Sequence, residues 1–516
     1  MYQFDNFLIR NAQMYPDRLA FVYREQHYTW RELNCAVNRL AHSFAKLGIG
    51  RGDRVAYMFP NCAETVLVFL ATQKLGATGM PINTHFLSGE ISRIMDVVDC
   101  KAAVYDAKFS DTIHEAQKLY GRLSCMIVKG EPKADEIDLS ALLNGDDDSE
   151  AQVDLTADDE SVIILTSGTT GTSKAVLRTQ SMMREYGLML AIENDNSHKP
   201  EVALTHCPFF HTACLSILVK MLALCGTFVL VDRVEPEFIF EQIEKYGVTM
   251  MLMVPPLLYM RLYDSGIWKQ RDTSTLREAQ FTGGKCSIDY VNKMFPNSKL
   301  RPSYGSTEVC ASCSAVLSRE EFLKKPDLCK TVGRINANCE MKLVDNDGNE
   351  VPVGEVGEGL VRSPAVFRGY IKNEELNKRV LDNGWFHTED LLRRDEDGFY
   401  YLVDRKKDMI KTGGENVYAQ EVEDVLRNHP AIFDCALIGV EDERFGEAVA
   451  AAIVLNPGME LSDEDLIAYC RANLPSYKKP RYVAFVDALP HNVTGKIQKS
   501  VLRENADKLF RPIRGL

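Results

Sequence analysis

A stretch rich in glycine, threonine and serine, L-T-S-G-T-T-G-T-S-K-A-V, runs from Leu165 to Val176 and contains a single lysine. Backbone N–H groups and hydroxyls in such a turn can surround a polyphosphate. A Walker loop needs G-x-x-x-x-G-K-[ST] and then a helix, but here Ser173 replaces the second glycine and Ala175 replaces the hydroxyl residue. The stretch therefore predicts a phosphate clamp that is not the clamp of a P-loop NTPase. Its expected phosphate-binding residues are Thr166, Ser167, Gly168, Thr169, Thr170, Gly171, Thr172 and Lys174.

The elements that must position this stretch are buried strands that alternate with helices. The apolar run S-V-I-I-L-T predicts a strand directly before it. Further upstream, Thr29 and Glu32 have the spacing of a capping box, and Gly48 ends the helical pattern that follows them. This alternation is typical of an α/β domain with mostly parallel sheets flanked by helices.

The pattern changes after about residue 330, where alternating runs flank an Asp347-Gly348 turn and predict a β-hairpin. The last part of the chain mixes helical segments such as S-D-E-D-L-I-A-Y-C-R-A-N-L with strands such as A-V-A-A-A-I-V-L. We therefore expect a large domain over residues 1–404, with a small β-rich subdomain over about 330–404. A small α+β C-terminal domain is expected over residues 405–516.

Composition excludes several classes of protein. The formal net charge of −13 disfavours a surface that grips nucleic acid. The 14 cysteines have no repeating spacing, so we expect free thiols in a reducing, cytoplasmic compartment, and the lone C-x-x-C at Cys310 and Cys313 does not predict zinc. The first residues lack a signal-peptide pattern, and the apolar run Leu215–Val231 contains Lys220, which favours a buried helix and strand over a membrane span. A monomer or a homodimer is expected.

Further motifs follow the phosphate stretch in order: P-F-F-H-T-A at 208–213, T-G-G-K-C-S at 282–287, S-Y-G-S-T-E at 303–308, G-W-F-H-T-E-D at 384–390, D-R-K-K-D-M-I-K-T-G-G-E-N-V at 404–417 and L-P-H-N-V-T-G-K-I at 489–497. Together they resemble the signatures of the adenylate-forming superfamily, which contains acyl-CoA synthetases, luciferases and peptide-synthetase adenylation domains. The resemblance spans nearly the whole chain. It implies two half-reactions at one site. A carboxylate attacks the α-phosphate of ATP to give an acyl-adenylate and pyrophosphate, and a thiol, commonly coenzyme A, then displaces AMP.

For the first half-reaction, the resemblance implies that Lys496 stabilises the α-phosphate, because two anions must meet there. Glu308 would bind Mg²⁺ and Thr307 would hydrogen-bond a phosphate. Tyr304 would stack on the adenine. The remaining positions implied to contact the nucleotide are Gly283, Gly284, Lys285, Ser303, Gly305, Ser306, and, at the ribose, Asp390 and Arg405.

For the second half-reaction, the resemblance implies that the small domain swings about a hinge at Lys407. The loop over residues 412–416 would then line the pantetheine tunnel of coenzyme A. Its glycine pair, Gly413-Gly414, permits close approach to a ligand. The neighbouring residues Lys411 and Glu415 are included in this expected site, and Lys411, Lys478 and Lys479 are weaker candidates for contacts to the phosphates of coenzyme A.

The chain departs from the superfamily pattern at several positions. Ser173 replaces the usual proline and Ala175 the usual glycine of the phosphate stretch, and Gln180 replaces a frequent histidine. Glu389 stands where relatives usually have glycine, and Lys285 replaces an alanine or glutamate. None of these changes removes a catalytic group, and both Lys496 and Glu308, which a non-catalytic relative would be expected to lose, are present.

The substrate is expected to be a carboxylic acid other than an amino acid. Amino-acid-activating relatives place an aspartate near P-F-F-H-T-A, and this stretch has no acid to pair a buried ammonium. His211 resembles the aromatic gate of acyl- and aryl-CoA synthetases, and the region around Cys310 is expected to help wall the acyl pocket. The sequence does not distinguish among fatty, aryl, steroid-like and carnitine-type acids as the substrate. No carrier domain follows Leu516, so coenzyme A is the favoured acceptor, with a luciferase-like enzyme or a carrier-protein ligase as the alternative.

Overall fold

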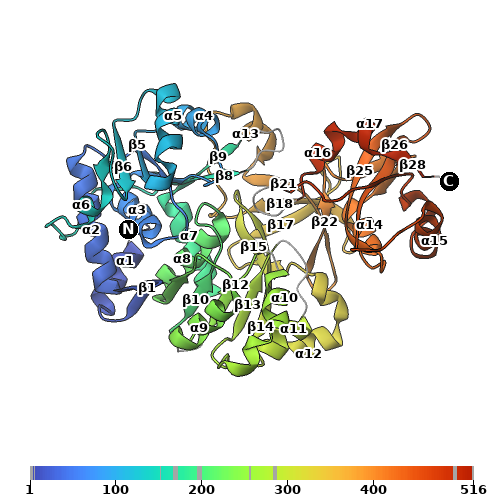
Figure 1. Ribbon diagram of the computed structural model, residues 1–516, viewed down its shortest axis with the longest axis horizontal. Coiled ribbons are helices and arrows are strands. Elements are labelled where there is room, and N and C mark those ends of the chain that lie inside the picture. The colour runs from blue at the N-terminus through green and yellow to red at the C-terminus, as the bar shows by residue number, and fades with distance from the viewer. Residues whose placement is uncertain are drawn as a thin grey trace. The chain divides into compact units, whose positions relative to one another are not determined.

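The computed structural model describes residue 4 and residues 6–151, 153–166, 173–193, 200–254, 257–282, 288–491 and 497–513. The chain divides into two compact units, each built from strands and helices (Figure 1). The first comprises Met1–Met341 with Val361–Phe386, and the second comprises Lys342–Leu360 with His387–Leu516.

One sheet of the first unit contains the strand that leads into the phosphate stretch. Its strands are β3 (Arg54–Met58), β4 (Thr78–Pro81), β5 (Ala102–Asp106), β6 (Cys125–Lys129), β7 (Ile137–Asp138), β8 (Glu160–Thr166), β9 (Lys174–Thr179) and β19 (Gly369–Tyr370). They lie in the order β19-β9-β8-β4-β3-β5-β6-β7. The pairings from β8 to β7 are parallel, whereas β9 runs antiparallel to both β8 and β19.

The second sheet of this unit contains the S-Y-G-S-T-E motif. Its strands are β1 (Leu19–Tyr23), β2 (Gln26–Thr29), β10 (Val202–Thr205), β11 (Thr227–Leu230), β12 (Met250–Leu252), β13 (Glu278–Phe281), β14 (Lys299–Ser306), β15 (Cys310–Ser314) and β16 (Arg334–Ile335). They lie in the order β16-β15-β14-β13-β12-β10-β11-β1-β2. The central pairings, from β14 to β1, are parallel. The predicted α/β class with mostly parallel sheets is thus confirmed.

Helices connect and cover these strands (Figure 1). They are α1 (Asn6–Met14), α2 (Trp30–Lys46), α3 (Ala63–Leu75), α4 (Ser88–Val98), α5 (Ser110–Tyr120), α6 (Leu139–Leu143), α7 (Gln180–Ile192), α8 (Thr212–Leu224), α9 (Pro236–Tyr246), α10 (Leu257–Asp264), α11 (Ile288–Met294), α12 (Arg319–Lys324) and α13 (Glu374–Val380). Short 3-10 turns cover Ala107–Phe109, Ile267–Gln270, Pro326–Lys330 and, in the second unit, Ser476–Lys478. The capping box at α2 is confirmed, since Glu32 N donates to Thr29 Oγ1 over 3.3 Å and Thr29 N donates to Glu32 Oε2 over 2.8 Å.

The main hydrophobic core joins the two sheets. It contains Val55 of β3 and Ala203 of β10 together with Val66 of α3 and Leu218 of α8. Every residue of α3 except Glu64 is buried, which explains a helix that is apolar on all sides. The apolar run Leu215–Val231 forms the end of α8 and then β11, as predicted, and no described helix is long and apolar enough to cross a membrane.

A β-rich region follows the second sheet. Its strands are β17 (Glu340–Val344), β18 (Val356–Arg362), β20 (Leu381–Asp382), β21 (Trp385–Arg394) and β22 (Tyr400–Arg405). They lie in the order β17-β18-β21-β20, with β22 paired to β21, and β17, β18 and β21 each pass from one unit into the other. The predicted turn at Asp347-Gly348 is present, because Gly348 has φ 85° and Val344 bridges Glu350.

The C-terminal part of the second unit has an α+β fold with its own sheet and helices. Its strands are β23 (Ile410–Thr412), β24 (Glu415–Val417), β25 (Ile432–Asp442), β26 (Gly446–Leu455), β27 (Tyr482–Phe485) and β28 (Arg511–Pro512), and its helices are α14 (Ala419–Leu426), α15 (Asp463–Asn473), α16 (Lys499–Glu504) and α17 (Ala506–Leu509). The expected boundary and hinge near Lys407 stay predictions.

Candidate active site

The phosphate stretch connects two paired strands. Thr166 at the end of β8 lies opposite Lys174 at the start of β9 in an antiparallel ladder. The chain therefore leaves the stretch as a strand, whereas a Walker loop opens a helix. This agrees with the exclusion of a P-loop NTPase. The remaining predicted clamp residues, Ser167–Thr172, lie outside the described residues.

Tyr370 links the end of the phosphate stretch to the S-Y-G-S-T-E motif. It lies beside β9, where it is paired with Val176, and its ring centroid is 5.1 Å from Lys174 Nζ. Its hydroxyl donates to Glu308 Oε1 over 2.8 Å. The expected phosphate-binding lysine and the expected metal-binding carboxylate thus share one tyrosine. Tyr370 could not be identified from the sequence, because it lies 62 residues from Glu308 in an R-G-Y segment that matches no motif.

The S-Y-G-S-T-E motif forms the end of β14 and the turn into β15. Tyr304 is 5% exposed, and Glu308 N donates to Ser306 Oγ over 3.2 Å, which closes the turn. Gly305 is required by close approach, because a Cβ there would lie 1.6 Å from the carbonyl oxygen of Cys310. The turn therefore fixes the backbone that carries Thr307 and Glu308.

A buried arginine supports this turn. Arg178 of β9 is 1% exposed, and its guanidinium donates to the carbonyl oxygens of Thr307 and Ala365. Its guanidinium carbon lies 6.0 Å from the ring centroid of Tyr186. Arg178 is a positioning residue for Thr307 that no motif identified, since L-R-T in a strand predicts only an edge or surface charge.

His211 is the N-cap residue of α8, and its expected role as an aromatic gate stays a prediction. Its ring centroid is 4.6 Å from that of Phe210, and Phe209 before it is 2% exposed. Asn61 holds this segment, because its Nδ2 donates to the carbonyl oxygens of His206 and Cys207 and its Oδ1 accepts from Phe209 N. Asn61 is a second support residue that the sequence did not reveal.

The adenine-side segment is only partly described. Thr282 Oγ1 donates to the Ser303 carbonyl over 3.1 Å, and Ser303 Oγ donates to the Phe281 carbonyl over 3.3 Å, so the ends of β13 and β14 are joined. The predicted residues Gly283, Gly284 and Lys285 lie outside the described residues.

In the second unit, Asp390 and Arg405 lie opposite each other on β21 and β22. Arg405 Nε is 3.4 Å from Asp390 Oδ1, and the Asp390 side chain is only 10% exposed. The predicted ribose-binding pair is therefore brought together. Directly before Asp390 in the motif, Glu389 adopts φ 58°, the left-handed conformation in which glycine is favoured.

The segment around Lys407 is attached to α16. Arg503 donates to Asp408 Oδ1 over 2.7 Å and to the Lys407 carbonyl over 3.4 Å. Desolvation, with Arg405 and Arg503 nearby, holds the pKa of Lys407 below its usual range. The predicted hinge residue therefore carries a backbone contact to a helix of the small domain.

The glycine pair forms the turn of the β23–β24 hairpin. Gly413 and Gly414 have φ 57° and 87°, and a Cβ on Gly413 would lie 3.2 Å from the Phe445 ring. Lys411 and Glu415 on this hairpin are exposed. Lys478, a weaker candidate for the coenzyme, is already paired with Glu421 over 2.6 Å.

The predicted catalytic Lys496 lies outside the described residues, but the ends of its segment are placed. His491 and Ile497 form an antiparallel bridge, and Gln498 N donates to the Pro490 carbonyl over 2.7 Å.

The donor set at Glu308 fits a magnesium ion. Within the described residues, no group of three or more His, Cys, Asp and Glu side chains is placed to hold a metal. Mg²⁺ bound with substrate phosphates needs only one or two carboxylates. The described residues use Glu308 Oε1 as an acceptor for Tyr370 and leave Oε2 open.

Comparison with known proteins agrees with this geometry. The family model for "AMP-binding enzyme" matches residues 8–371, and that for the "AMP-binding enzyme C-terminal domain" matches residues 421–496. The chain is 31% identical to feruloyl-CoA synthase of Amycolatopsis sp, over 96% of this chain and 97% of that protein. It is 32% identical to the long-chain-fatty-acid–CoA ligase FadD13 of Mycobacterium tuberculosis, over 92% of each.

Among solved structures, o-succinylbenzoate CoA synthetase (MenE) of Bacillus subtilis with its acyl-adenylate intermediate superposes with a TM-score of 0.84 at 28% identity, over 96% of this chain and 97% of that chain. The same enzyme has also been solved with ATP and a magnesium ion. With the two family models covering most of its length, this chain belongs to the AMP-binding enzyme family and is a carboxylate–CoA ligase of the adenylate-forming superfamily.

Proposed function

We propose that the chain activates a carboxylic acid other than an amino acid as its acyl-adenylate, with release of pyrophosphate, and then transfers the acyl group to coenzyme A with release of AMP. The observation that carries the proposal is the convergence of Lys174 and Glu308 on Tyr370. A cation at the end of a phosphate clamp and a carboxylate open to a metal suit a polyphosphate substrate better than any other ligand class.

In the first half-reaction the residues of the first unit bind and orient the triphosphate. Lys174 neutralises phosphate charge, Tyr370 fixes the orientation of the Glu308 carboxylate, and Arg178 holds the Thr307 backbone against movement. Magnesium, when bound at Glu308, supplies positive charge to the phosphate oxygens. Lys496 is proposed to stabilise the α-phosphate as the carboxylate attacks it.

The second unit is proposed to hold the ribose. Asp390 is nearly buried and can accept from both ribose hydroxyls, while Arg405 lies beside its carboxylate and orients it. Lys407 is proposed as the hinge that lets this unit serve both half-reactions.

Coenzyme A is proposed as the acceptor of the second half-reaction. The two residues of the Gly413-Gly414 turn carry no side chains, which suits close approach of the narrow pantetheine arm. Lys411 and Glu415 flank this turn. The alternatives, a luciferase-like reaction or transfer to a carrier protein, use the same first half-reaction and differ only in the acceptor.

The acid is proposed to lack an α-ammonium group. Phe209 and Phe210 of P-F-F-H-T-A are buried, and a substrate ammonium beside them would lack a counter-charge. The relatives named above act on aryl and long-chain fatty acids, which agrees with this exclusion. All the described cysteines are free thiols, which supports a reducing, cytoplasmic location.

The test is pyrophosphate release from ATP and Mg²⁺ across a panel of fatty, aryl and carnitine-type acids and the common amino acids, with and without coenzyme A. We expect release with acids of the first groups, and a thioester and AMP by mass spectrometry when coenzyme A is present. Release with amino acids alone contradicts the substrate class, and release without any thioester contradicts the acceptor.

Two variants test the roles of single residues in adenylate formation. Lys496→Ala and Glu308→Gln are each expected to abolish adenylate formation. Glu320→Gln is the matched control, because Glu320 is 75% exposed on α12 and pairs with Lys324. Unchanged adenylate formation in Lys496→Ala would remove that residue from the mechanism.

A further inference from the structure

The strand that follows the S-Y-G-S-T-E motif contains a β-bulge. In the antiparallel pairing of β14 with β15, Tyr304 lies opposite Cys313. The next residue of β14, Gly305, lies opposite Ala311, which is two residues from Cys313. Ser312 is therefore the extra residue on β15, and it is fully buried. A bulge interrupts the ladder, so buried backbone carbonyls around it need hydrogen-bond donors from elsewhere in the chain.

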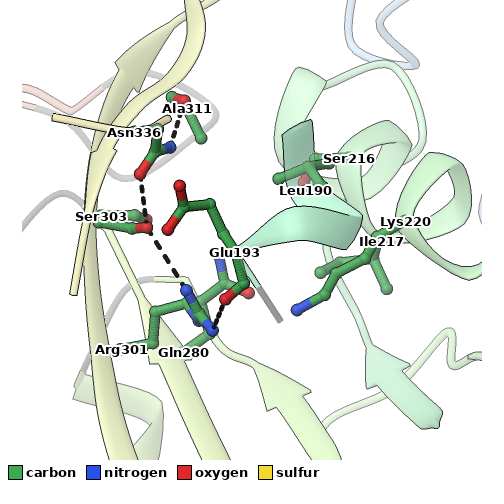
Figure 2. A pocket seen from close by; sticks show the side chains of 11 residues that line it. Leu190, Glu193, Ser216, Ile217, Lys220, Gln280, Arg301, Ser303, Ala311 and Asn336 are labelled. Carbon is green, nitrogen blue, oxygen red and sulfur yellow. Dashed lines mark hydrogen bonds between the residues drawn. The ribbon is translucent and has the colours of Figure 1, made fainter. Parts of the chain in front are cut away.

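Asn336, which directly follows β16, supplies these donors and is 2% exposed. Its backbone N donates to the Ser312 carbonyl over 2.9 Å, and its Nδ2 donates to the Ala311 carbonyl over 2.8 Å (Figure 2). Its Oδ1 accepts from Ser314 Oγ over 2.8 Å. Because a backbone carbonyl can only accept, the amide nitrogen has to face Ala311. One buried side chain thus joins the residues on both sides of the bulge.

Asn336 is itself held in place. Its carbonyl accepts from Cys339 N over 2.9 Å, and the next residue, Ala337, donates its N–H to Glu193 Oε1 over 2.9 Å. Glu193 lies at the C-terminal end of α7, and its carbonyl accepts from Arg301 of β14 over 2.8 Å. The segment that carries the Asn336 amide is therefore tied to a helix and, through it, to the strand that leads into the motif.

The position of the bulge bears directly on the turn of the motif. Cys310, the first residue of β15, has φ 57°, a left-handed conformation that persists only where the surroundings fix the residue. Its carbonyl lies so close to Gly305 that a Cβ there would be 1.6 Å away. The turn that carries Thr307 and Glu308 ends at Cys310, so a displacement of Ala311 would move this turn as well.

We propose that Asn336 is a positioning residue for the first half-reaction. By holding the bulge at Ala311 and Ser312, it fixes the orientation in which the turn presents Thr307 and Glu308 to the triphosphate and its magnesium ion. The inference rests on the proposed function and extends it to a residue outside every motif. A role in stability alone would instead predict that substitutions of Asn336 leave the binding of MgATP unchanged.

The test uses Asn336→Asp in the full chain. This variant keeps the shape of the side chain and the acceptor for Ser314, but it places a carboxylate oxygen against the Ala311 carbonyl. A small misplacement of positioned groups is costly, so we expect kcat for pyrophosphate release to fall by about 10- to 100-fold. The Kd of MgATP, measured by calorimetry, should rise about tenfold. Hydrogen exchange of the backbone over residues 303–314, measured by mass spectrometry, should become faster.

Ser314→Ala is the matched control, because it removes the other hydrogen bond of the same amide, which has the same length. It should lower the melting temperature as Asn336→Asp does, but leave the Kd of MgATP and kcat unchanged. Asn336→Gln keeps the amide donor on a longer arm and should give values between those of Asn336→Asp and the wild type. If Asn336→Asp does not fold, the comparison of Asn336→Gln with Ser314→Ala decides in the same way.

An unchanged Kd of MgATP in Asn336→Asp, or equal losses in Asn336→Asp and Ser314→Ala, overturns the inference while the proposed function stands. A wild type that neither binds MgATP nor releases pyrophosphate with any acid contradicts the proposed function instead. Hydrogen exchange then decides on Asn336 alone: faster exchange over residues 303–314 in Asn336→Asp than in Ser314→Ala supports its hold on the turn, and equal exchange overturns it.

Discussion

The hydroxyl of Tyr370 donates a 2.8 Å hydrogen bond to Oε1 of Glu308, and the two residues lie 62 positions apart in the chain. The antiparallel pairing of β19 with β9 makes this contact, because it sets Tyr370 opposite Val176, close to the end of the phosphate stretch. A carboxylate with one oxygen held by a hydrogen bond is oriented before any ligand arrives, and such preorganisation reduces the cost of binding.

Tyr370→Phe removes that hydrogen bond and leaves the ring beside Lys174. A hydrogen bond to a charged group contributes about 1.5–3 kcal/mol, so we expect kcat/KM for ATP to fall by about 10- to 100-fold. The concentration of Mg²⁺ that gives half-maximal pyrophosphate release should rise, since the ligand is no longer oriented. Tyr401→Phe is the control, because Tyr401 donates an equivalent bond to Asp395 Oδ2 over 3.0 Å away from the motifs. Equal effects in the two variants would show that the loss is one of stability rather than orientation.

Contacts between residues near in sequence, or within a motif, could be predicted from the sequence. Contacts between residues far apart in the chain could not. The capping box of α2, the Asp347-Gly348 turn and the Asp390–Arg405 strand pair rest on residues near in sequence or on motifs. Tyr370 rests on a two-residue strand pairing across the sheet, which leaves no periodic pattern.

Arg178 shows the same limit. Its buried contacts to the carbonyls of Thr307 and Ala365 arise from tertiary packing, and one charged residue in an apolar strand gives no local signal of them. Lys220 shows it again: its place in an apolar run argues only against a membrane span, because its partner Glu278 lies on a strand far along the chain.

Glu389 offers a test of local strain, because it adopts φ 58° where relatives usually have glycine. A residue with a side chain in that conformation costs roughly 1 kcal/mol, while glycine costs about 0.5–1 kcal/mol in the unfolded state. Glu389→Gly should therefore leave the free energy of unfolding unchanged or raise it by up to about 0.5 kcal/mol. Arg394→Gly in the same strand, where φ is not positive, should lower it by about 1 kcal/mol. Denaturant unfolding of both variants measures the difference, and an equal loss in the two would show that Glu389 is not strained.

Glu136 predicts a pH dependence of stability. Burial would raise the pKa of its carboxyl, but hydrogen bonds from Lys133 N, Ser110, Tyr105 and His114 outweigh burial and lower the pKa to about 2. Because the pKa in the folded state lies below the ordinary value of 4.5, the contribution to stability is complete above pH 4.5 and is lost as the pH falls towards 2.

Glu136→Gln should therefore lower the melting temperature at neutral pH and flatten its decline between about pH 4.5 and 2. Glu131→Gln is the control, because Glu131 is exposed on the same loop. A wild type and a Glu136→Gln variant with parallel profiles through that range would contradict the assignment. Thermal melts at closely spaced pH values provide the measurement.

Substitution of Gly413 is expected to slow the second half-reaction and leave the first unchanged. Its φ of 57° and the 3.2 Å approach of an added Cβ to the Phe445 ring mean that Gly413→Ala distorts the turn of the β23–β24 hairpin. If this turn lines the path of coenzyme A, thioester formation from preformed acyl-adenylate should slow by at least about tenfold, while pyrophosphate release stays near the wild-type rate. Gly458→Ala is the matched control, because Gly458 has φ 76° with nothing within 4 Å of an added Cβ. Both variants should lose about 1 kcal/mol of stability from the left-handed conformation, but only Gly413→Ala should slow the transfer. Slower pyrophosphate release in Gly413→Ala, or slower transfer in both variants, would show that the hairpin has no specific role in the second half-reaction.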